Sequence, residues 1–252
     1  MLRYNIVMII LGITGAIGHG KSTIAEILSK LEPNSRTFET SEVISEVASE
    51  LCKHFDHQAI TLDNPTSIND WLSYLPAILS NTLNQPIDTE LFTLEPSKIG
   101  SKTAEYAKLW EFIEWAKSNS ERVHMLITEE NKASFRPLLQ WIGGFCVENI
   151  SPIIWNTELL KRVSNAGAEG CVLAILGGIR FNEEALHVQN NGGLIIEVIR
   201  PSIQVQDSND PTERQRSRIK PDHIIMNDGT LQELTAKVGQ LYTEIVSAQP
   251  KA

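Results

Sequence analysis

The stretch GITGAIGHGKST at residues 12–23 contains the complete pattern G-x-x-x-x-G-K-[ST], which begins at Gly15 and ends at Ser22. Glycines allow backbone conformations in which successive N–H groups face one anion, and a helix that starts here points its positive end at the same anion. In such a loop Lys21 bridges the β- and γ-phosphates of ATP, and the Ser22 hydroxyl binds Mg²⁺. The sequence therefore predicts a loop for a nucleoside triphosphate. Its predicted nucleotide-binding residues are Gly15, Ala16, Ile17, Gly18, His19, Gly20, Lys21, Ser22 and Thr23.

The residues on both sides of the loop support this prediction. Residues 5–14 are continuously apolar and rich in β-branched side chains, which is typical of a strand buried on both faces of a parallel sheet. Residues 21–31 place apolar side chains at positions 24, 27, 28 and 31, which is helical spacing. A phosphate loop requires this order of strand, glycine-rich turn and helix, whereas a chance match to the pattern would not.

The same criteria predict the rest of a layered fold. Predicted strands occupy residues 35–40, 171–176, 194–200 and 223–226, and predicted helices occupy 42–54, 103–117, 136–145, 155–166 and 231–246. The helix at 136–145 is expected to end near Gly143 and Gly144, and the proline-rich residues 56–99 are expected to form short helices and loops. We therefore expect a three-layer α/β/α fold with a five-stranded parallel sheet, whose site lies at the carboxyl ends of the strands.

Composition limits the classes of function. The net charge of the 252 residues is −9, so the chain is a poor partner for a nucleic acid polymer. The cysteines Cys52, Cys146 and Cys171 form no C-x-x-C pair, which argues against disulfides or structural zinc and favours the cytoplasm. The apolar run at residues 6–13 is too short to span a bilayer, so no membrane association is expected.

Several stretches resemble known kinase families. Residues 12–23 are similar to the start of dephospho-CoA kinases and of phage-type deoxynucleoside monophosphate kinases. Three later stretches resemble the second family: residues 136–143 its R-x-L-L-Q-x-x-G stretch, residues 178–185 its D-V-R-F-x-N-E-A motif, and residues 222–231 its D-x-x-I-x-N-D-G-T-L element. The likeness covers residues 1–40 and roughly 130–246, and residues 56–100 contribute nothing to it.

The resemblance implies an activity and roles for residues outside the loop. It implies transfer of the γ-phosphoryl group of ATP to a (deoxy)nucleoside monophosphate, within a fold like that of nucleoside monophosphate kinases and with small nucleotides as partners. By the same resemblance, Arg136, Gln140 and Trp155 belong to the acceptor site. Arg180 lies near the transferring phosphate and acts with Lys21 in catalysis. Arginine suits such roles because its guanidinium fork makes paired bonds to phosphate oxygens, although structural salt bridges are the alternative.

A basic cluster and the overall organisation complete the expectation. Arg214, Arg216 and Arg218 lie between the last two predicted strands, where monophosphate kinases usually carry a lid whose arginines close over the phosphates. A lid at about 201–220 is therefore expected, with a solvated loop as the alternative. We expect a single kinase domain over residues 1–252, with a substrate-side insertion at about 56–166, and the resemblance leaves a homodimer open.

Two positions depart from the family pattern. The aspartate expected before the arginine motif is Gly178 here, and the one expected after the second strand is Thr40. Glu39, Glu42 or Glu129 could supply a carboxylate instead, and Glu129 is the strongest candidate because it ends an apolar run. Two alternatives therefore stay open: a kinase for another small acceptor such as dephospho-CoA, and a nucleotide-binding protein with weak or no catalysis.

Overall fold

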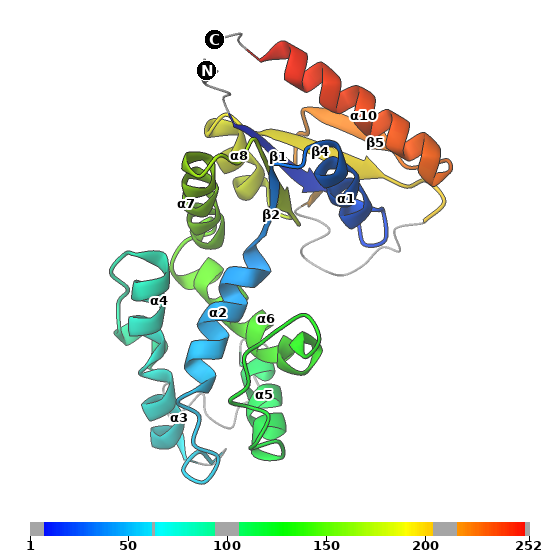
Figure 1. The fold of residues 1–252 in the computed structure, drawn as a ribbon. Coiled ribbons are helices and arrows are strands. Elements are labelled where there is room, and N and C mark those ends of the chain that lie inside the picture. The colour runs from blue at the N-terminus through cyan, green and yellow to red at the C-terminus, as the bar shows by residue number, and fades with distance from the viewer. Residues whose placement is uncertain (1–7, 62–63, 94–105, 204–215, 250–252) are drawn as a thin grey trace. The chain divides into compact units, whose positions relative to one another are not determined.

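The computed structural model of the chain describes residues 8–61, 64–93, 106–203 and 216–249 (Figure 1). Within these residues, five parallel strands form one sheet in the order β2-β3-β1-β4-β5. The strands are β1 (Ile9–Thr14), β2 (Ser35–Glu39), β3 (Leu173–Gly177), β4 (Leu194–Ile199) and β5 (His223–Met226). The continuously apolar β1 lies at the centre, because only a central strand buries side chains on both faces.

Helices cover both faces of this sheet. On one face, α1 (Lys21–Leu31) and α10 (Leu231–Ala248) pack on a core formed by alternate residues of the strands, such as Leu11, Ile175 and Val198. On the opposite face, α8 (Asn182–Asn190) packs on β1 and β4. The helix α7 (Ile154–Ala168) leads into β3. The predicted three-layer α/β/α fold with a five-stranded parallel sheet is confirmed.

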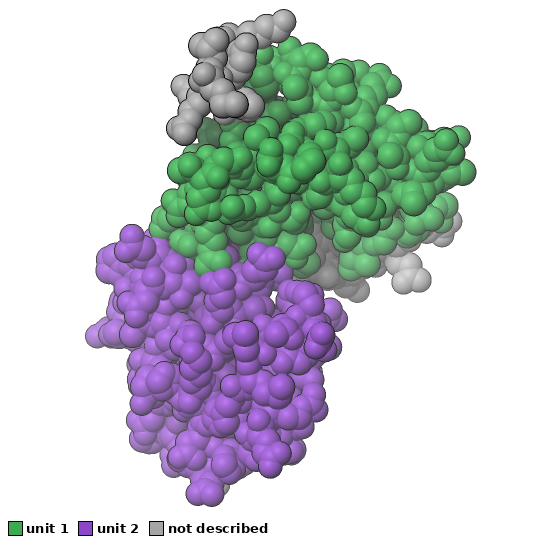
Figure 2. Space-filling model, in the orientation of Figure 1, with its two compact units in different colours: residues 1–40, 156–252 green, residues 41–155 purple. Residues whose placement is uncertain are grey.

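The chain divides into two compact units (Figure 2). The sheet unit comprises residues 1–40 and 156–252, and the helical unit comprises residues 41–155. The helical unit contains α2 (Thr40–Cys52), α3 (Pro65–Leu72), α4 (Leu75–Leu83), the short 3-10 helix η1 (Glu90–Phe92), α5 (Ala107–Lys117) and α6 (Lys132–Asn149). The first residue of α2, Thr40, is counted with the sheet unit. The predicted insertion at about 56–166 overlaps this unit, and the single-domain organisation stays a prediction.

Aromatic side chains hold the helical unit together. The ring of Phe112 in α5 lies within about 6 Å of the rings of Phe55, Trp71, Trp115 and Phe135, measured between ring centroids. These rings come from segments that are far apart in the sequence, so they tie α5 and α6 to the helices that precede them. Burial of such large side chains explains why short, proline-interrupted helices form a compact unit here.

Two sequence expectations were wrong in detail. The helix expected to end near Gly143 continues as α6 to Asn149. Gly143 allows α2 to approach, since a Cβ added there would lie 3.2 Å from Ile44 Cδ1, so this glycine serves packing rather than termination. The sequence also missed α8, whose nine residues are too short for a clear helical period.

Candidate active site

The glycine-rich loop joins β1 to α1 at the carboxyl edge of the sheet. Gly15 has a φ of 145° and Gly20 a φ of 103°, a region that favours glycine. Space is also restricted: a Cβ on Gly15 would lie 2.6 Å from the Val198 carbonyl oxygen, and a Cβ on Gly20 would lie 2.6 Å from Asn227 Nδ2. Both fixed glycines of the sequence pattern are therefore required by backbone shape and by close packing on neighbouring strands.

Three side-chain hydrogen bonds hold the loop and the strand before it in place. His19 is buried, and its Nδ1 donates to the carbonyl oxygen of Val198 in β4 at 3.1 Å. Asn227, which directly follows β5, donates from Nδ2 to the carbonyl oxygen of His19 at 2.9 Å. Thr14 donates from Oγ1 to the carbonyl oxygen of Ile179, after β3, at 2.8 Å. The loop is thus fixed before any ligand binds, which is the arrangement that electrostatic stabilisation needs.

The predicted phosphate contacts lie at the exposed part of this loop. Lys21 Nζ donates to the carbonyl oxygens of Gly15 at 2.7 Å and Ala16 at 2.9 Å. Ile17 and Gly18 form the exposed tip, and Ser22 is exposed in the first turn of α1. The Lys21 ammonium group therefore already lies within the loop, and the positive end of α1 faces the same space.

Arg180 follows β3 at the same edge of the sheet. Its side chain is exposed, while its backbone N–H donates to Glu184 Oε2 at 2.9 Å. The N–H of Phe181 donates to the same oxygen at 3.1 Å, so the Glu184 carboxylate caps the start of α8. Burial raises the pKa of Glu184, although the two N–H groups and the Arg180 charge act in the opposite direction. This cap fixes the backbone from which the Arg180 guanidinium extends.

The end of β3 has no side chains. Gly177 and Gly178 are its last residue and the one after it, and Gly178 has a φ of 72°. Glu39, the last residue of β2, pairs with Gly177 in the sheet. A Cβ on Gly177 would lie 2.8 Å from Glu39 Oε1, so the Glu39 carboxylate occupies the space above the glycine.

The described part of the predicted lid contains two of its three arginines. Arg216 Nη1 forms an ion pair with Glu197 Oε1 of β4 at 3.1 Å. Arg218 is exposed. Arg214 and most of the lid expected at about 201–220 lie outside the described residues.

In the helical unit, the structure brings two predicted acceptor residues together. Arg136 and Gln140 lie one turn apart on α6 and line a hollow of about 270 Å³ against α5. The other lining residues are Lys108, Glu111, Trp115, Ala133, Ser134 and Pro137. Trp155 does not line this hollow: it is buried, and its Nε1 donates to the Gly143 carbonyl oxygen at 3.0 Å.

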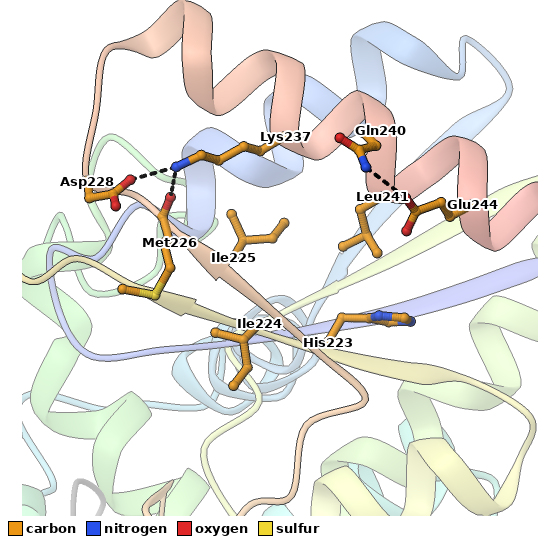
Figure 3. Close-up of a pocket in the computed structure, with 9 residues that line it drawn as sticks. All are labelled: His223, Ile224, Ile225, Met226, Asp228, Lys237, Gln240, Leu241 and Glu244. Atoms are coloured by element: carbon orange, nitrogen blue, oxygen red, sulfur yellow. Dashed lines mark hydrogen bonds and ion pairs between the residues drawn. The ribbon is translucent and has the colours of Figure 1, made fainter.

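A larger hollow of about 460 Å³ lies between β5 and α10 (Figure 3). Its polar groups bind one another: Lys237 Nζ donates to Asp228 Oδ1 at 2.6 Å and to the Met226 carbonyl oxygen at 3.0 Å, and Gln240 donates to Glu244 at 2.9 Å. None of the predicted site residues lines it. The hollow extends along the flank of the sheet, so we assign no nucleotide to it.

Comparison with known proteins identifies the family. A family model described as deoxynucleotide monophosphate kinase matches residues 80–238, which is more than half of the chain. The chain belongs to the deoxynucleotide monophosphate kinase family. It is therefore a phosphotransferase that uses ATP to phosphorylate deoxynucleoside monophosphates. No curated protein matches the chain.

The extent of the family match corrects one expectation. It begins at residue 80, so residues 80–100 contribute to the likeness, contrary to the expectation from sequence. It includes the segments that contain Arg136, Gln140, Trp155 and Arg180. The glycine-rich loop precedes the matched range, so its assignment in this kinase rests on its own sequence and geometry.

Sequence reasoning missed the residues that position the loop. His19 was predicted only as part of the nucleotide-binding stretch, yet its buried ring ties that stretch to β4. Asn227 was noted only as part of the stretch 222–231, yet its amide holds the loop from the end of β5. The one available signal for Asn227 was its place directly after a predicted strand, at the edge where the loop was expected.

Proposed function

We propose that the loop at residues 15–23 of this deoxynucleotide monophosphate kinase binds the triphosphate of Mg²⁺·ATP, and that Arg180 faces the transferring phosphoryl group. The observation that carries the proposal is the loop itself, whose glycines are sterically required and whose backbone is tied to β4 and β5. A loop that is fixed in advance needs no reorganisation when charge develops in the transition state.

Lys21 and Arg180 supply the positive charge in this proposal. Lys21 Nζ, which donates to two loop carbonyl oxygens, would exchange them for β- and γ-phosphate oxygens that carry full charge. Arg180 is exposed on a backbone capped by Glu184, and its guanidinium fits two oxygens of one phosphoryl group. Positioning and neutralisation of charge account for the reaction without a protein base.

The residues at the loop fit a magnesium ion bound together with the nucleotide. Ser22 presents a hydroxyl group and Glu39 a carboxylate, and both are exposed. Oxygen ligands of this kind suit Mg²⁺, which usually takes one or two protein groups and completes its octahedron with phosphates and waters. Ser22, the hydroxyl residue of the glycine-rich pattern, is the protein ligand that we propose. The ion would neutralise the triphosphate charge.

The hollow in the helical unit is the proposed site of the acceptor. Arg136 would hold the monophosphate through paired bonds, and Gln140 would bind polar atoms of the nucleotide from the next turn of α6. Trp155 donates to the Gly143 carbonyl oxygen, so in this proposal it supports α6 one turn beyond Gln140. The lid arginines, Arg214, Arg216 and Arg218, would close over the phosphates and exclude water.

Cell compartment and assembly belong to the same proposal. Cys52, Cys146 and Cys171 are free and buried, which supports a reducing cytoplasm as the site of action. Among the helices that the structure describes, none is long and apolar enough to cross a bilayer. A homodimer stays a prediction, which analytical ultracentrifugation of the purified chain would test.

ADP release from Mg²⁺·ATP tests the proposed function. Each common ribo- and deoxyribonucleoside monophosphate is offered singly, beside a control without acceptor. We expect acceptor-dependent ADP from one or a few deoxynucleoside monophosphates, and a loss of at least about 1000-fold in Lys21→Ala, as for loss of a preorganised charge that contacts the phosphates. The control variant is Lys30→Ala, which removes an exposed lysine paired with Glu26 on the same helix. Equal turnover in Lys21→Ala and the parent would refute the role of the loop.

A further inference from the structure

The acidic side chain of Glu39 lies directly beside the side-chain-free end of β3. Because Gly177 and Gly178 end this strand, it presents no group to a cation at the carboxyl edge of the sheet. An aspartate at position 178 would be strained, since the φ of 72° there is a backbone conformation that L side chains rarely adopt. Glu39 reaches the same place from the neighbouring strand, with Oε1 2.8 Å from the ideal Cβ position of Gly177.

The Glu39 side chain points to the face of the sheet that carries α1. In β3, Leu173 and Ile175 belong to the core shared with α1, and Gly177 follows at the same alternation. Paired residues of parallel strands point to the same face, and Glu39 pairs with Gly177. Ser22 lies in the first turn of α1, which packs on that same face. The carboxylate and the proposed hydroxyl ligand are therefore presented on one face and at one edge of the sheet.

The surroundings of three other carboxylates differ from those of Glu39. Glu129, the strongest candidate from sequence, pairs with Lys132 at 2.6 Å. Glu197 pairs with Thr14 in the sheet, which puts it on the opposite face, where it binds Arg216. Glu184 caps α8 through two backbone N–H groups. Glu39 is exposed at the end of its strand, so a hydrated ion can reach it.

We propose that Glu39 supplies the carboxylate of the Mg²⁺·ATP site that the end of β3 lacks. Its carboxylate would hold water molecules bound to the ion, while Ser22 would supply a hydroxyl ligand from the first turn of α1. Carboxylate oxygens are preferred partners of Mg²⁺ and of its bound waters. The inference rests on the proposed function, because it assumes that the loop binds ATP together with the ion.

A titration with Mn²⁺·ADP tests the role of Glu39 without turnover. The electron paramagnetic resonance signal of free Mn²⁺ is used to monitor how much of the metal is bound. We expect Glu39→Gln to weaken Mn²⁺·ADP binding by about 10-fold or more, as removal of outer-shell partners of a metal does. When EDTA removes the metal, the affinity of Glu39→Gln for ADP should stay within about 2-fold of the parent. So small a change corresponds to no lost contact with the nucleotide. Glu26→Gln, which removes an exposed carboxylate from α1, is the matched control and should bind like the parent.

A second variant moves the carboxylate back to β3. In Glu39→Ala/Gly177→Asp the side chain that crowds the Gly177 Cβ position is shortened, so an aspartate fits there. We expect this double variant to bind Mn²⁺·ADP at least about 5-fold more tightly than Glu39→Ala, as for a regained outer-shell contact.

Either of two results would overturn the inference. One is parent-like Mn²⁺·ADP affinity in Glu39→Gln, and the other is an equal loss of ADP affinity with and without metal, which would mark a merely structural role. Phosphoryl transfer by the parent is measured separately. Failure of the proposed function therefore appears in the parent, whereas failure of the Glu39 role appears only between variants.

Discussion

At the scale of single residues, the nucleotide loop depends on glycines whose missing side chains leave room for neighbouring strands. Gly20 combines a φ of 103° with an added Cβ that would lie 2.6 Å from Asn227 Nδ2. The same Asn227 amide binds the carbonyl oxygen of His19, so a side chain at position 20 would disturb the bond that holds the loop. Backbone shape and tertiary support are thus coupled in one place.

Gly20→Ala is expected to lose nucleotide binding. A left-handed conformation costs an alanine about 1–2 kcal/mol, and displacement of Asn227 adds to this. Since about 1.4 kcal/mol corresponds to a tenfold change, the affinity for ATP should fall by about 10-fold or more. Isothermal titration calorimetry with ATP measures the change, and unaltered affinity would contradict the geometry described for the loop.

At the scale of helices and strands, α6 contains two adjacent glycines whose surroundings differ. Gly143 faces Ile44 of α2 closely, whereas an added Cβ on Gly144 would meet nothing within 4 Å. Gly144→Ala should therefore stabilise the protein by about 0.5–1 kcal/mol, because alanine restricts the unfolded chain and favours helix. Urea denaturation measures the gain. Gly143→Ala is the matched comparison. An equal gain in the free energy of unfolding in both variants would show that the contact with α2 does not restrict the side chain at position 143.

The start of α8 makes stability depend on pH through one buried carboxyl group. Burial raises the pKa of Glu184 above its ordinary value of 4.5, so folding favours the protonated form. The stability contributed by this group is then fully present below pH 4.5 and is lost as the pH rises through the folded pKa.

Glu184→Gln should relieve this loss, because glutamine carries no charge and keeps an oxygen that accepts the N–H groups of Arg180 and Phe181. We expect a higher Tm than the parent at pH 8, and a difference that shrinks toward pH 4. Thermal denaturation across this range measures it. Glu148→Gln, which changes an exposed carboxylate of α6, is the control. A Glu184→Gln advantage in Tm that grows toward low pH would contradict the expected direction of the pH dependence.

At the scale of the whole molecule, our proposal assigns the donor and acceptor roles to different units. The nucleotide loop and Arg180 belong to the sheet unit, whereas the hollow with Arg136 and Gln140 belongs to the helical unit. Substitutions in the two units should therefore affect different substrates in steady-state kinetics. Changes to the sheet unit should affect ATP, and changes to the hollow should affect the monophosphate.

Arg136→Ala should raise KM for the monophosphate by about 10- to 100-fold, since a hydrogen bond to a charged group contributes about 1.5–3 kcal/mol. KM for ATP should stay unchanged. Initial-rate kinetics with each substrate varied in turn measures both values. Lys53→Ala, which removes an exposed cation of the helical unit paired with Glu50, should change neither. An equal rise in both KM values would argue against an acceptor role for Arg136.

Local pattern was sufficient for much of this kinase. The order of strand, glycine-rich loop and helix could be read from residues 5–31, because buried strands and amphipathic helices have distinct apolar periods and the loop has fixed glycines. The helix α1 and the strand β5 agree with their predicted bounds. The parallel sheet also followed from sequence, since four of its five strands are short apolar runs and predicted helices lie between most of them.

Tertiary structure alone decided which side chains meet at the site. The pairing of Glu39 with Gly177 depends on the register between β2 and β3, and that register comes from packing of whole strands rather than from residues near either position. Sequence favoured Glu129 as the missing carboxylate, and the pairing of β2 with β3 brings Glu39 forward as a further candidate beside the end of β3. Contacts between distant segments carry no local period, so the bonds from His19 and Asn227 became visible only once the chain was folded.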